Sequence, residues 1–446
     1  MRKPAPSSSS SRPWLALVGA LTAGLATAPA AAEPAAELAA AAAARPNVIV
    51  IVADDLGYGD VGFNGGRDLR TPRLDALAKS GVVATEGYVA ASVCSPSRAG
   101  LMTGRYPQRF GHENNIPEEP GNNNLGLPVA EKTIGDVMKA AGYATGAIGK
   151  WHLGQAPVFH PNRRGFDEFF GFLGGMHDYL PGRASQIERN GVPVKETRYL
   201  TNAFGDEAAD FVKRHRNEPF FLYLAFNAPH TPMQAPPGYL ARFANIADPT
   251  RRTYAAMVSA LDDAIGHVAD TLAENNLERR TLVVFLSDNG ANKTYGGSNA
   301  PLKNGKASLY EGGVRIPFFL RWPGTLPAGR SDDRPIISLD ILPTAAAVAG
   351  ANPATKPLDG VNLLPYLRGT NQGQPHDALF WRRKGSAAVR VARWKLIEPK
   401  DNDEKMYDLA TDPDESADLL SREDSTATTL ETRLAAWNRQ LVPPLW

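Results

Sequence analysis

The sequence is poor in cysteine and in net charge, and both shortages narrow the classes of protein it can encode. Its 446 residues contain one cysteine, Cys94, so no disulfide forms within the chain and no cysteine-based zinc cluster assembles. The 48 lysines and arginines nearly balance the 47 aspartates and glutamates, giving a formal charge of +1. This balance provides no bulk electrostatic attraction for nucleic acid or for an acidic membrane surface.

Long apolar runs are also missing. Residues 1–32 begin with basic side chains, continue through an apolar run over residues 14–21 and end in small residues. That order is typical of a secretory signal peptide, and the run is shorter than the roughly 20 residues of a membrane-spanning helix. We predict a cleaved signal peptide over 1–32, an alanine-rich linker over 33–45, and an exported protein, periplasmic or secreted, with no membrane anchor. A disordered tail is the alternative.

The rest of the chain alternates strand-like and helix-like segments. The strand-like runs are short and apolar, and they cover residues 47–53, 143–148, 220–226 and 282–286. The helix-like segments between them cover residues 71–79, 133–141, 202–216 and 254–275. This alternation predicts an α/β domain with a large, mainly parallel sheet.

After Pro343 the pattern changes to short strand-like runs over residues 379–397, followed by a helix-like segment over residues 426–441. We therefore predict a catalytic α/β domain over residues 46–350 and a smaller C-terminal α+β subdomain over residues 351–446.

Polar residues follow three of the strand-like runs. Asp54 and Asp55 come directly after the first, His230 follows the third, and Asp288 and Asn289 follow the fourth. Ligands gather at the carboxyl ends of parallel strands, and paired oxygen donors suit a hard cation such as Ca²⁺ or Mg²⁺. Each pair alone is equally well explained by turn and cap chemistry; their joint placement favours a metal site.

A dinucleotide-binding pattern, G-x-G-x-x-G, also occurs at residues 57–62, with Glu86 at the approximate position of a ribose-binding acid. Asp54 and Asp55 precede it and would repel a pyrophosphate. Two glycines at 65–66 interrupt the helix that should follow. We reject this interpretation.

Cys94 begins the sequence Cys-Ser-Pro-Ser-Arg, which is followed by a segment ending at Gly104. Proline near the start and glycine at the end predict a short helix, with Cys94 at its positive end and Arg98 one turn along. An anion could bind there. A buried structural cysteine is the alternative interpretation, because free cysteines are usually buried.

This pentapeptide resembles the signature of the type I sulfatases, which depend on formylglycine and belong to the alkaline phosphatase-like superfamily. The resemblance extends over residues 46 to 420. It includes Asp54-Asp55, Gly149-Lys150-Trp151-His152-Leu153-Gly154, Ala228-Pro229-His230-Thr231-Pro232, Ser287-Asp288-Asn289-Gly290, Lys306 with Tyr310-Glu311-Gly312-Gly313-Val314-Arg315, and Met406-Tyr407-Asp408-Leu409.

The resemblance implies a large sheet sandwiched by helices and a hydrolase of sulfate monoesters. It further implies that Cys94 is oxidised to formylglycine by a maturation enzyme, and that Ca²⁺, with Mg²⁺ as the alternative, sits beside it. The metal ligands implied are Asp54, Asp55, residue 94, Asp288 and Asn289. In the implied mechanism one hydroxyl of the hydrated aldehyde attacks sulfur, and the other then expels sulfate.

The same resemblance assigns roles to the remaining polar residues. Arg98, Lys150, Lys306 and His230 would surround the sulfate, and His230 or Lys306 would protonate the departing oxygen. Asp288 would deprotonate the attacking hydroxyl, and His152 would accept the second proton. Lys303 competes with Lys306, but spacing to Glu311 favours Lys306. His177 is a further substrate-binding candidate; Met176 replaces a serine that some family members carry there.

The substrate expected from export is a sulfated carbohydrate. Two other functions stay open at this point: a phosphomonoester or phosphonate-ester hydrolase with a related metal site, and a non-catalytic protein that binds sulfated glycans.

Overall fold

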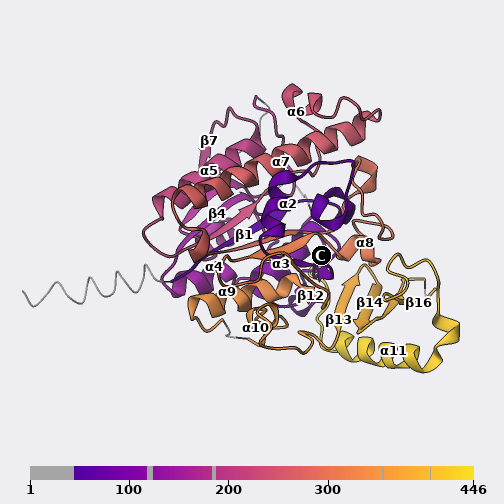
Figure 1. Ribbon diagram of the computed structural model, residues 1–446. Coiled ribbons are helices and arrows are strands. Elements are labelled where there is room, and N and C mark those ends of the chain that lie inside the picture. The colour runs from indigo at the N-terminus through magenta and orange to yellow at the C-terminus, as the bar shows by residue number, and fades with distance from the viewer. Residues whose placement is uncertain (1–44, 118–123, 183–186, 354–355, 402) are drawn as a thin grey trace, which may run out of the picture. The chain divides into compact units, whose positions relative to one another are not determined.

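The computed structural model describes residues 45–117, 124–182, 187–353, 356–401 and 403–446 (Figure 1). The predicted signal peptide and nearly all of the predicted linker lie outside these residues. Among the helices that are described, none is both long and apolar enough to cross a membrane.

A ten-stranded sheet lies at the centre of the described chain, in the order β11-β2-β10-β9-β1-β8-β4-β5-β6-β7. Its strands are β1 (Asn47–Ala53), β2 (Val82–Ala84), β4 (Ala144–Lys150), β5 (Glu168–Phe172), β6 (Ile187–Arg189), β7 (Val192–Val194), β8 (Phe220–Ala225), β9 (Thr281–Ser287), β10 (Phe318–Arg321) and β11 (Arg330–Asp332). The neighbours β9, β1, β8, β4 and β5 all run parallel, whereas β10, β6 and β7 pair antiparallel. The predicted mainly parallel sheet is confirmed.

Strand β1 shows why the sheet needs helices on both faces. All seven of its residues are buried. Ile49 and Ile51 belong to one apolar core, and Val48 and Val50 belong to the other. Side chains alternate across a strand, so each core covers one face.

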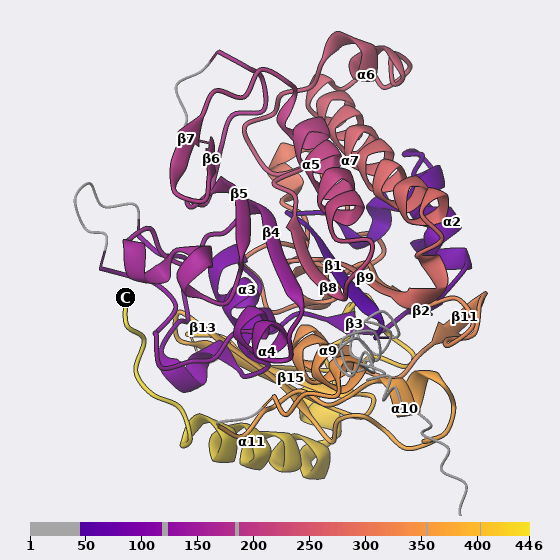
Figure 2. The same cartoon turned by 90° about the vertical axis from the view of Figure 1, so that its left-hand side faces the viewer.

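The first core packs α2 (Pro72–Lys79), α5 (Leu200–Arg214) and α7 (Pro249–Glu274) on the sheet, and the second packs α3 (Cys94–Thr103), α4 (Ile134–Ala140) and α9 (Ile341–Ala349) on the opposite face (Figure 2). The shorter helices are α6 (Pro237–Ala241), α8 (Glu311–Val314) and α10 (Leu364–Leu367).

Local capping chemistry explains where two of the predicted helices begin. Helix α7 starts at Pro249, ahead of the predicted Tyr254, because the Asp248 side chain accepts a hydrogen bond from the Thr250 amide at 2.9 Å. Proline fits the first helical position because no hydrogen bond from its nitrogen is needed there. Helix α4 starts after Thr133, whose hydroxyl and backbone amide pair with Asp136 in a capping box.

The glycines of the G-x-G-x-x-G pattern are explained by packing. A Cβ atom at Gly57 would lie 2.1 Å from the Ser298 carbonyl oxygen, and one at Gly59 would lie 2.6 Å from that of Ala300. The Gly59 amide also donates to the Ser298 carbonyl at 3.0 Å. These glycines therefore allow two backbone segments to approach closely.

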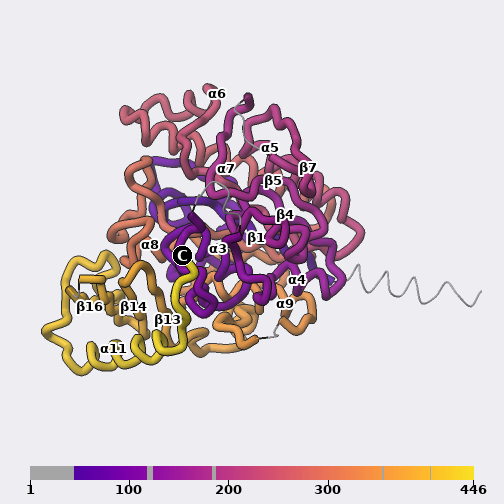
Figure 3. Tube along the Cα trace, turned by 180° about the vertical axis from the view of Figure 1, so that it is seen from behind, coloured from indigo at the N-terminus to yellow at the C-terminus, as the bar shows by residue number. Residues whose placement is uncertain are grey.

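The C-terminal part of the chain forms a second, four-stranded antiparallel sheet of β13 (Leu379–Arg383), β14 (Ser386–Val391), β15 (Trp394–Glu398) and β16 (Lys405–Asp408). Helix α11 (Asp424–Asn438) runs along this sheet (Figure 3). Its apolar core includes Tyr88 and Leu339 from the earlier part of the chain. The short strands β3 (Gly87–Tyr88) and β12 (Ile336–Ile337) pair beside it. The domain boundary after residue 350 stays a prediction.

Candidate active site

Four adjacent strands of the central sheet end at the candidate site. Asp288 and Asn289 follow β9, Asp54 and Asp55 follow β1, and His230 follows β8. The next strand, β4, ends with Lys150 itself. Residues that are far apart in the sequence are thus brought together at the carboxyl edge of the sheet.

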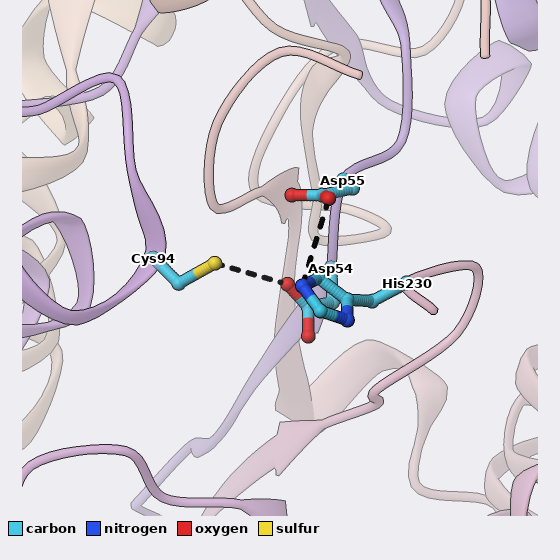
Figure 4. Close-up of side chains that lie close together, drawn as sticks. All are labelled: Asp54, Asp55, Cys94 and His230. Carbon is cyan, nitrogen blue, oxygen red and sulfur yellow. Dashed lines mark hydrogen bonds and ion pairs between the residues drawn. The ribbon is translucent and has the colours of Figure 1, made fainter. Parts of the chain in front are cut away.

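Cys94 approaches this edge from the first turn of α3. It is buried, and its thiol donates a hydrogen bond to Asp54 Oδ1 at 3.4 Å (Figure 4). Lys306 Nζ donates to the sulfur at 3.2 Å. Burial, followed by the charge of Asp288, raises the pKa of the thiol well above its ordinary value, and the nearby lysines do not reverse this. An unmodified Cys94 is therefore a protonated and weak nucleophile.

Two lysines contact the carboxylates that follow β1. Lys150 Nζ donates to Asp54 Oδ2 at 2.6 Å, and Lys306 Nζ donates to Asp55 Oδ2 at 2.8 Å. Burial alone would raise the pKa of the Asp54 carboxyl, but the positive charges of Lys150, His230 and Arg98 together outweigh it and the pKa is lowered. The Asp54 carboxylate is therefore held ionised.

Arg98 lies one helical turn beyond Cys94, and its side chain is fully buried. Its Nε donates to Asp288 Oδ2 at 3.0 Å, and its Nη2 lies 3.7 Å from Asp54 Oδ1. The Asp55 amide donates to the other Asp288 oxygen at 3.2 Å. Asp288 therefore orients Arg98 and the Asp55 backbone.

The oxygen donors of the site, which are the carboxylates of Asp54 and Asp55 and the amide oxygen of Asn289, fit a hard divalent cation. Ligand atoms of Asp54, Asp55, Cys94 and His230 all lie within 4.8 Å of one another. The side-chain oxygen of Asn289, Oδ1, is also buried, and it has no hydrogen-bond partner among the described residues. A buried amide oxygen without a donor requires an explanation, and a bound cation supplies one.

His230 was predicted as a substrate contact, and its Nε2 lies 3.8 Å from Asp55 Oδ2, close enough to join the group of candidate ligands (Figure 4). Both oxygens of Asp288 accept hydrogen bonds in the structure, while its predicted role as a ligand remains open.

His152 follows Lys150 after the end of β4 and has a positive φ of 55°. Burial, together with the charges of Lys150 and Arg98, lowers the pKa of its imidazole well below the ordinary value. Its Nδ1 is buried and finds no partner in the described part of the chain. A Cβ atom at Gly175 would lie 2.7 Å from His152 Nε2, so the glycine leaves room for the ring. His152 is a neutral base and can accept a proton.

Ser95 and His112 form a buried support for His152 that was not predicted from the sequence. The Ser95 hydroxyl donates to the His152 carbonyl at 2.7 Å and lies 2.6 Å from His112 Nε2. Burial lowers the pKa of His112 to about 3. His112 is neutral, and the proton on its Nε2 donates to the serine oxygen. The only feature of the sequence that draws attention to His112 is the pair His112-Glu113, which resembles an incomplete zinc-protease motif.

The structure places His177 against Asp178 and against Phe172 of β5. Its Nδ1 contacts the Asp178 carbonyl at 2.6 Å, its ring packs 4.9 Å from that of Phe172, and its Nε2 is a buried atom with no partner among the residues described. It lines a cavity of about 530 Å³ with Lys195 and Arg198. Exposed Met176 lies beside it, and the Thr231 hydroxyl approaches the Met176 sulfur to 3.8 Å.

Comparison with known proteins identifies related chains over nearly the whole described region. A family model described as Sulfatase matches residues 46–351, and one described as N-sulphoglucosamine sulphohydrolase, C-terminal, matches residues 304–440. The crystal structure of Ps i-CgsB is similar with a TM-score of 0.86 and 42% sequence identity, covering 90% of this chain and 94% of its own. It has also been determined in complex with k-i-k-neocarrahexaose.

Two curated relatives are similar over most of the chain. N-acetylgalactosamine-6-sulfatase of Canis lupus familiaris is 35% identical over 80% of this chain and 72% of its own. Steryl-sulfatase of Mus musculus is 34% identical over 78% of this chain and 69% of its own. The fold, the motifs and these relatives agree, so the chain belongs to the sulfatase family and is a sulfuric ester hydrolase.

Proposed function

We propose that this enzyme is exported and hydrolyses sulfate monoesters on a sulfated carbohydrate, with a formylglycine made from Cys94 and a divalent cation. The observation that carries the proposal is the position of Cys94. It begins a helix, faces the Asp54 carboxylate and receives a hydrogen bond from Lys306. The raised pKa of the thiol makes the unmodified side chain a weak nucleophile, which favours a modified residue as the reacting group.

The cation and the modified residue would have different chemical roles. Asp54, Asp55, Asp288 and Asn289 would hold Ca²⁺, or Mg²⁺ as the alternative; the orphaned Asn289 oxygen supports this set. The formylglycine hydrate supplies a nucleophilic hydroxyl and a second hydroxyl for release of sulfate, and the cation supplies positive charge beside them.

The chain's own side chains bind the sulfate and move protons. Arg98, Lys150 and Lys306 present three cations at the carboxyl edge of the sheet, where they would neutralise the sulfate oxygens. His230 or Lys306 would protonate the departing alcohol oxygen. His152 is neutral because its pKa is lowered, so it would accept the proton lost from residue 94.

The choice of a carbohydrate rests on relatives. Ps i-CgsB, at 42% identity, forms a complex with an oligosaccharide, and another relative is named for N-acetylgalactosamine 6-sulfate chemistry. A steryl-sulfatase is similar at 34% identity, so family membership alone does not select the substrate. The composition of residues 1–32 supports export.

The test compares hydrolysis of an aryl sulfate with hydrolysis of the matching aryl phosphate. We expect the sulfate to be preferred, and Cys94→Ala to lower its turnover by at least about a thousandfold because no nucleophile remains. A strong preference for the phosphate, or full activity in Cys94→Ala, would reject the proposal.

A further inference from the structure

The end of strand β13 carries two adjacent arginines in unlike surroundings. Arg382 donates through Nε to Glu113 Oε1 at 2.6 Å, so its charge is compensated. Arg383 forms no ion pair with any acid in the described part of the chain. The one hydrogen bond that its side chain makes there is from Nη1 to the Ala307 carbonyl at 3.0 Å.

Two further observations show that neither the hydrogen-bonding capacity nor the charge of the Arg383 side chain is fully compensated. Its Nε is buried and has no hydrogen-bond partner among the described residues. Burial lowers the pKa of its guanidinium, and no neighbouring acid contributes to restoring it. A partly buried cation without a counter-charge is costly, which favours a ligand that supplies one.

The guanidinium contacts the segment that carries Lys306. Ala307, which accepts its hydrogen bond, directly follows Lys306 and is exposed. Lys306 in turn contacts the sulfur of Cys94, and the Ala307 amide donates to the Ser92 carbonyl at 2.8 Å. The β13–β14 hairpin therefore brings a cation from the C-terminal sheet next to the segment that carries Lys306.

We infer that Arg383 binds a second anionic group of the substrate, a sulfate or a carboxylate on the sugar chain, outside the pocket of the sulfate that is cleaved. This inference rests on the proposed function. The sulfate that is cleaved would already be surrounded by Arg98, Lys150 and Lys306, so Arg383 is not needed for it. Its Nη2 makes no hydrogen bond among the described residues, and a planar guanidinium can donate to two oxygens of one anion. The preferred substrate is therefore multiply charged.

Binding is measured by calorimetry on the full chain carrying Cys94→Ala, which cannot turn substrate over. The probes are three disaccharides: one with a single sulfate, one with two sulfates, and one with a sulfate and a carboxylate. We expect at least one doubly charged probe to bind about tenfold more tightly than the singly charged probe. Adding Arg383→Ala should abolish this difference, and Arg383→Lys should keep only part of it. The two doubly charged probes distinguish sulfate from carboxylate.

Arg216→Ala is the matched control. Arg216 is exposed, donates to a single carbonyl, that of Lys213, at 2.9 Å, and precedes β8 at the opposite edge of the sheet. It should leave the tenfold difference intact. Equal binding of all probes by the Arg383-containing chain, or a difference that survives Arg383→Ala, overturns the inference. Failure of the wild-type enzyme to hydrolyse an aryl sulfate would overturn the proposed function instead.

Discussion

At the scale of single residues, the surroundings of the Cys94 thiol make it a weak nucleophile. It is buried beside Asp54, and its raised pKa keeps it protonated. The cations around it, Lys150 and Lys306, already contact carboxylates. An anionic substrate would pair with these lysines, and a bound cation would pair with the carboxylates. The arrangement is therefore suited to binding both.

Ser95 is expected to position His152. Ser95→Ala removes the donor to the buried His152 carbonyl, and the cost of an unpaired carbonyl corresponds to about a tenfold fall in kcat for an aryl sulfate. KM should be unchanged because Ser95 does not face the substrate. Steady-state kinetics measure both, with Ser95→Thr as the control that restores the hydroxyl. Wild-type kcat in Ser95→Ala would show that the support is dispensable.

The orphaned oxygen of Asn289 provides a test of the cation that does not depend on turnover. Adding Ca²⁺ to chelator-treated enzyme should raise Tm, because binding to the folded state stabilises it. Asn289→Leu removes the oxygen at similar size and should weaken this rise. Differential scanning calorimetry at several Ca²⁺ concentrations measures it. An Asn289→Leu curve that matches wild type would exclude Asn289 as a ligand.

The residues that directly follow strands could be predicted from the sequence, because a strand end fixes where the next side chains lie. Asp54 and Asp288 are of this kind, and His230 lies a few residues beyond the end of β8. The support of His152 by His112 could not be predicted, since the two residues meet only through the hydroxyl of Ser95. The position of Arg383 could not be predicted either, because an arginine next to a turn normally extends into solvent.

At the scale of elements, β1 positions the site residues because it pairs with the two strands that carry the other polar clusters. It pairs with β8 on one side and β9 on the other, so three polar clusters share one edge. Its continuous apolar run made it recognisable in the sequence. The antiparallel strand β10 was missed because its four residues, 318–321, give no periodic signal.

Truncation within β1 tests this element. Val50 is fully buried, so Val50→Ala should lower the free energy of unfolding by about 2 kcal/mol through lost burial and the cavity left behind. Val129→Ala makes the same chemical change at a side chain that is 59% exposed, and it should cost less than about 0.5 kcal/mol. Urea denaturation compares the two. Equal effects would mean that β1 is not part of a tightly packed core.

At the scale of the whole described chain, a buried charge cluster joins the C-terminal sheet to the catalytic segment. Lys395 of β15 lies 2.8 Å from Glu311 Oε1 and 3.0 Å from Glu415 Oε1, with all three side chains fully buried. Glu311 begins α8, five residues after Lys306. Two carboxylates share one ammonium, and burial raises the pKa of Glu415 to about 7 although Lys395 opposes it.

This cluster predicts a pH dependence of stability. The pKa of Glu415 is higher in the folded protein than in the unfolded chain, so its stabilising contribution is complete below the unfolded pKa and is lost as pH rises through about 7. Relative to Glu415→Gln, wild type should lose on the order of 2 kcal/mol of unfolding free energy between about pH 5 and about pH 8. Exposed Glu423→Gln is the control. A pH-independent difference would contradict the assignment.

The central claim is that Cys94 is converted to formylglycine in the active enzyme. Mass spectrometry of the peptide containing residue 94, from enzyme produced in its native host, tests it most directly. We predict the mass of the formylglycine form, which also reacts with an aldehyde-specific reagent. An unmodified thiol throughout a fully active preparation would contradict the claim.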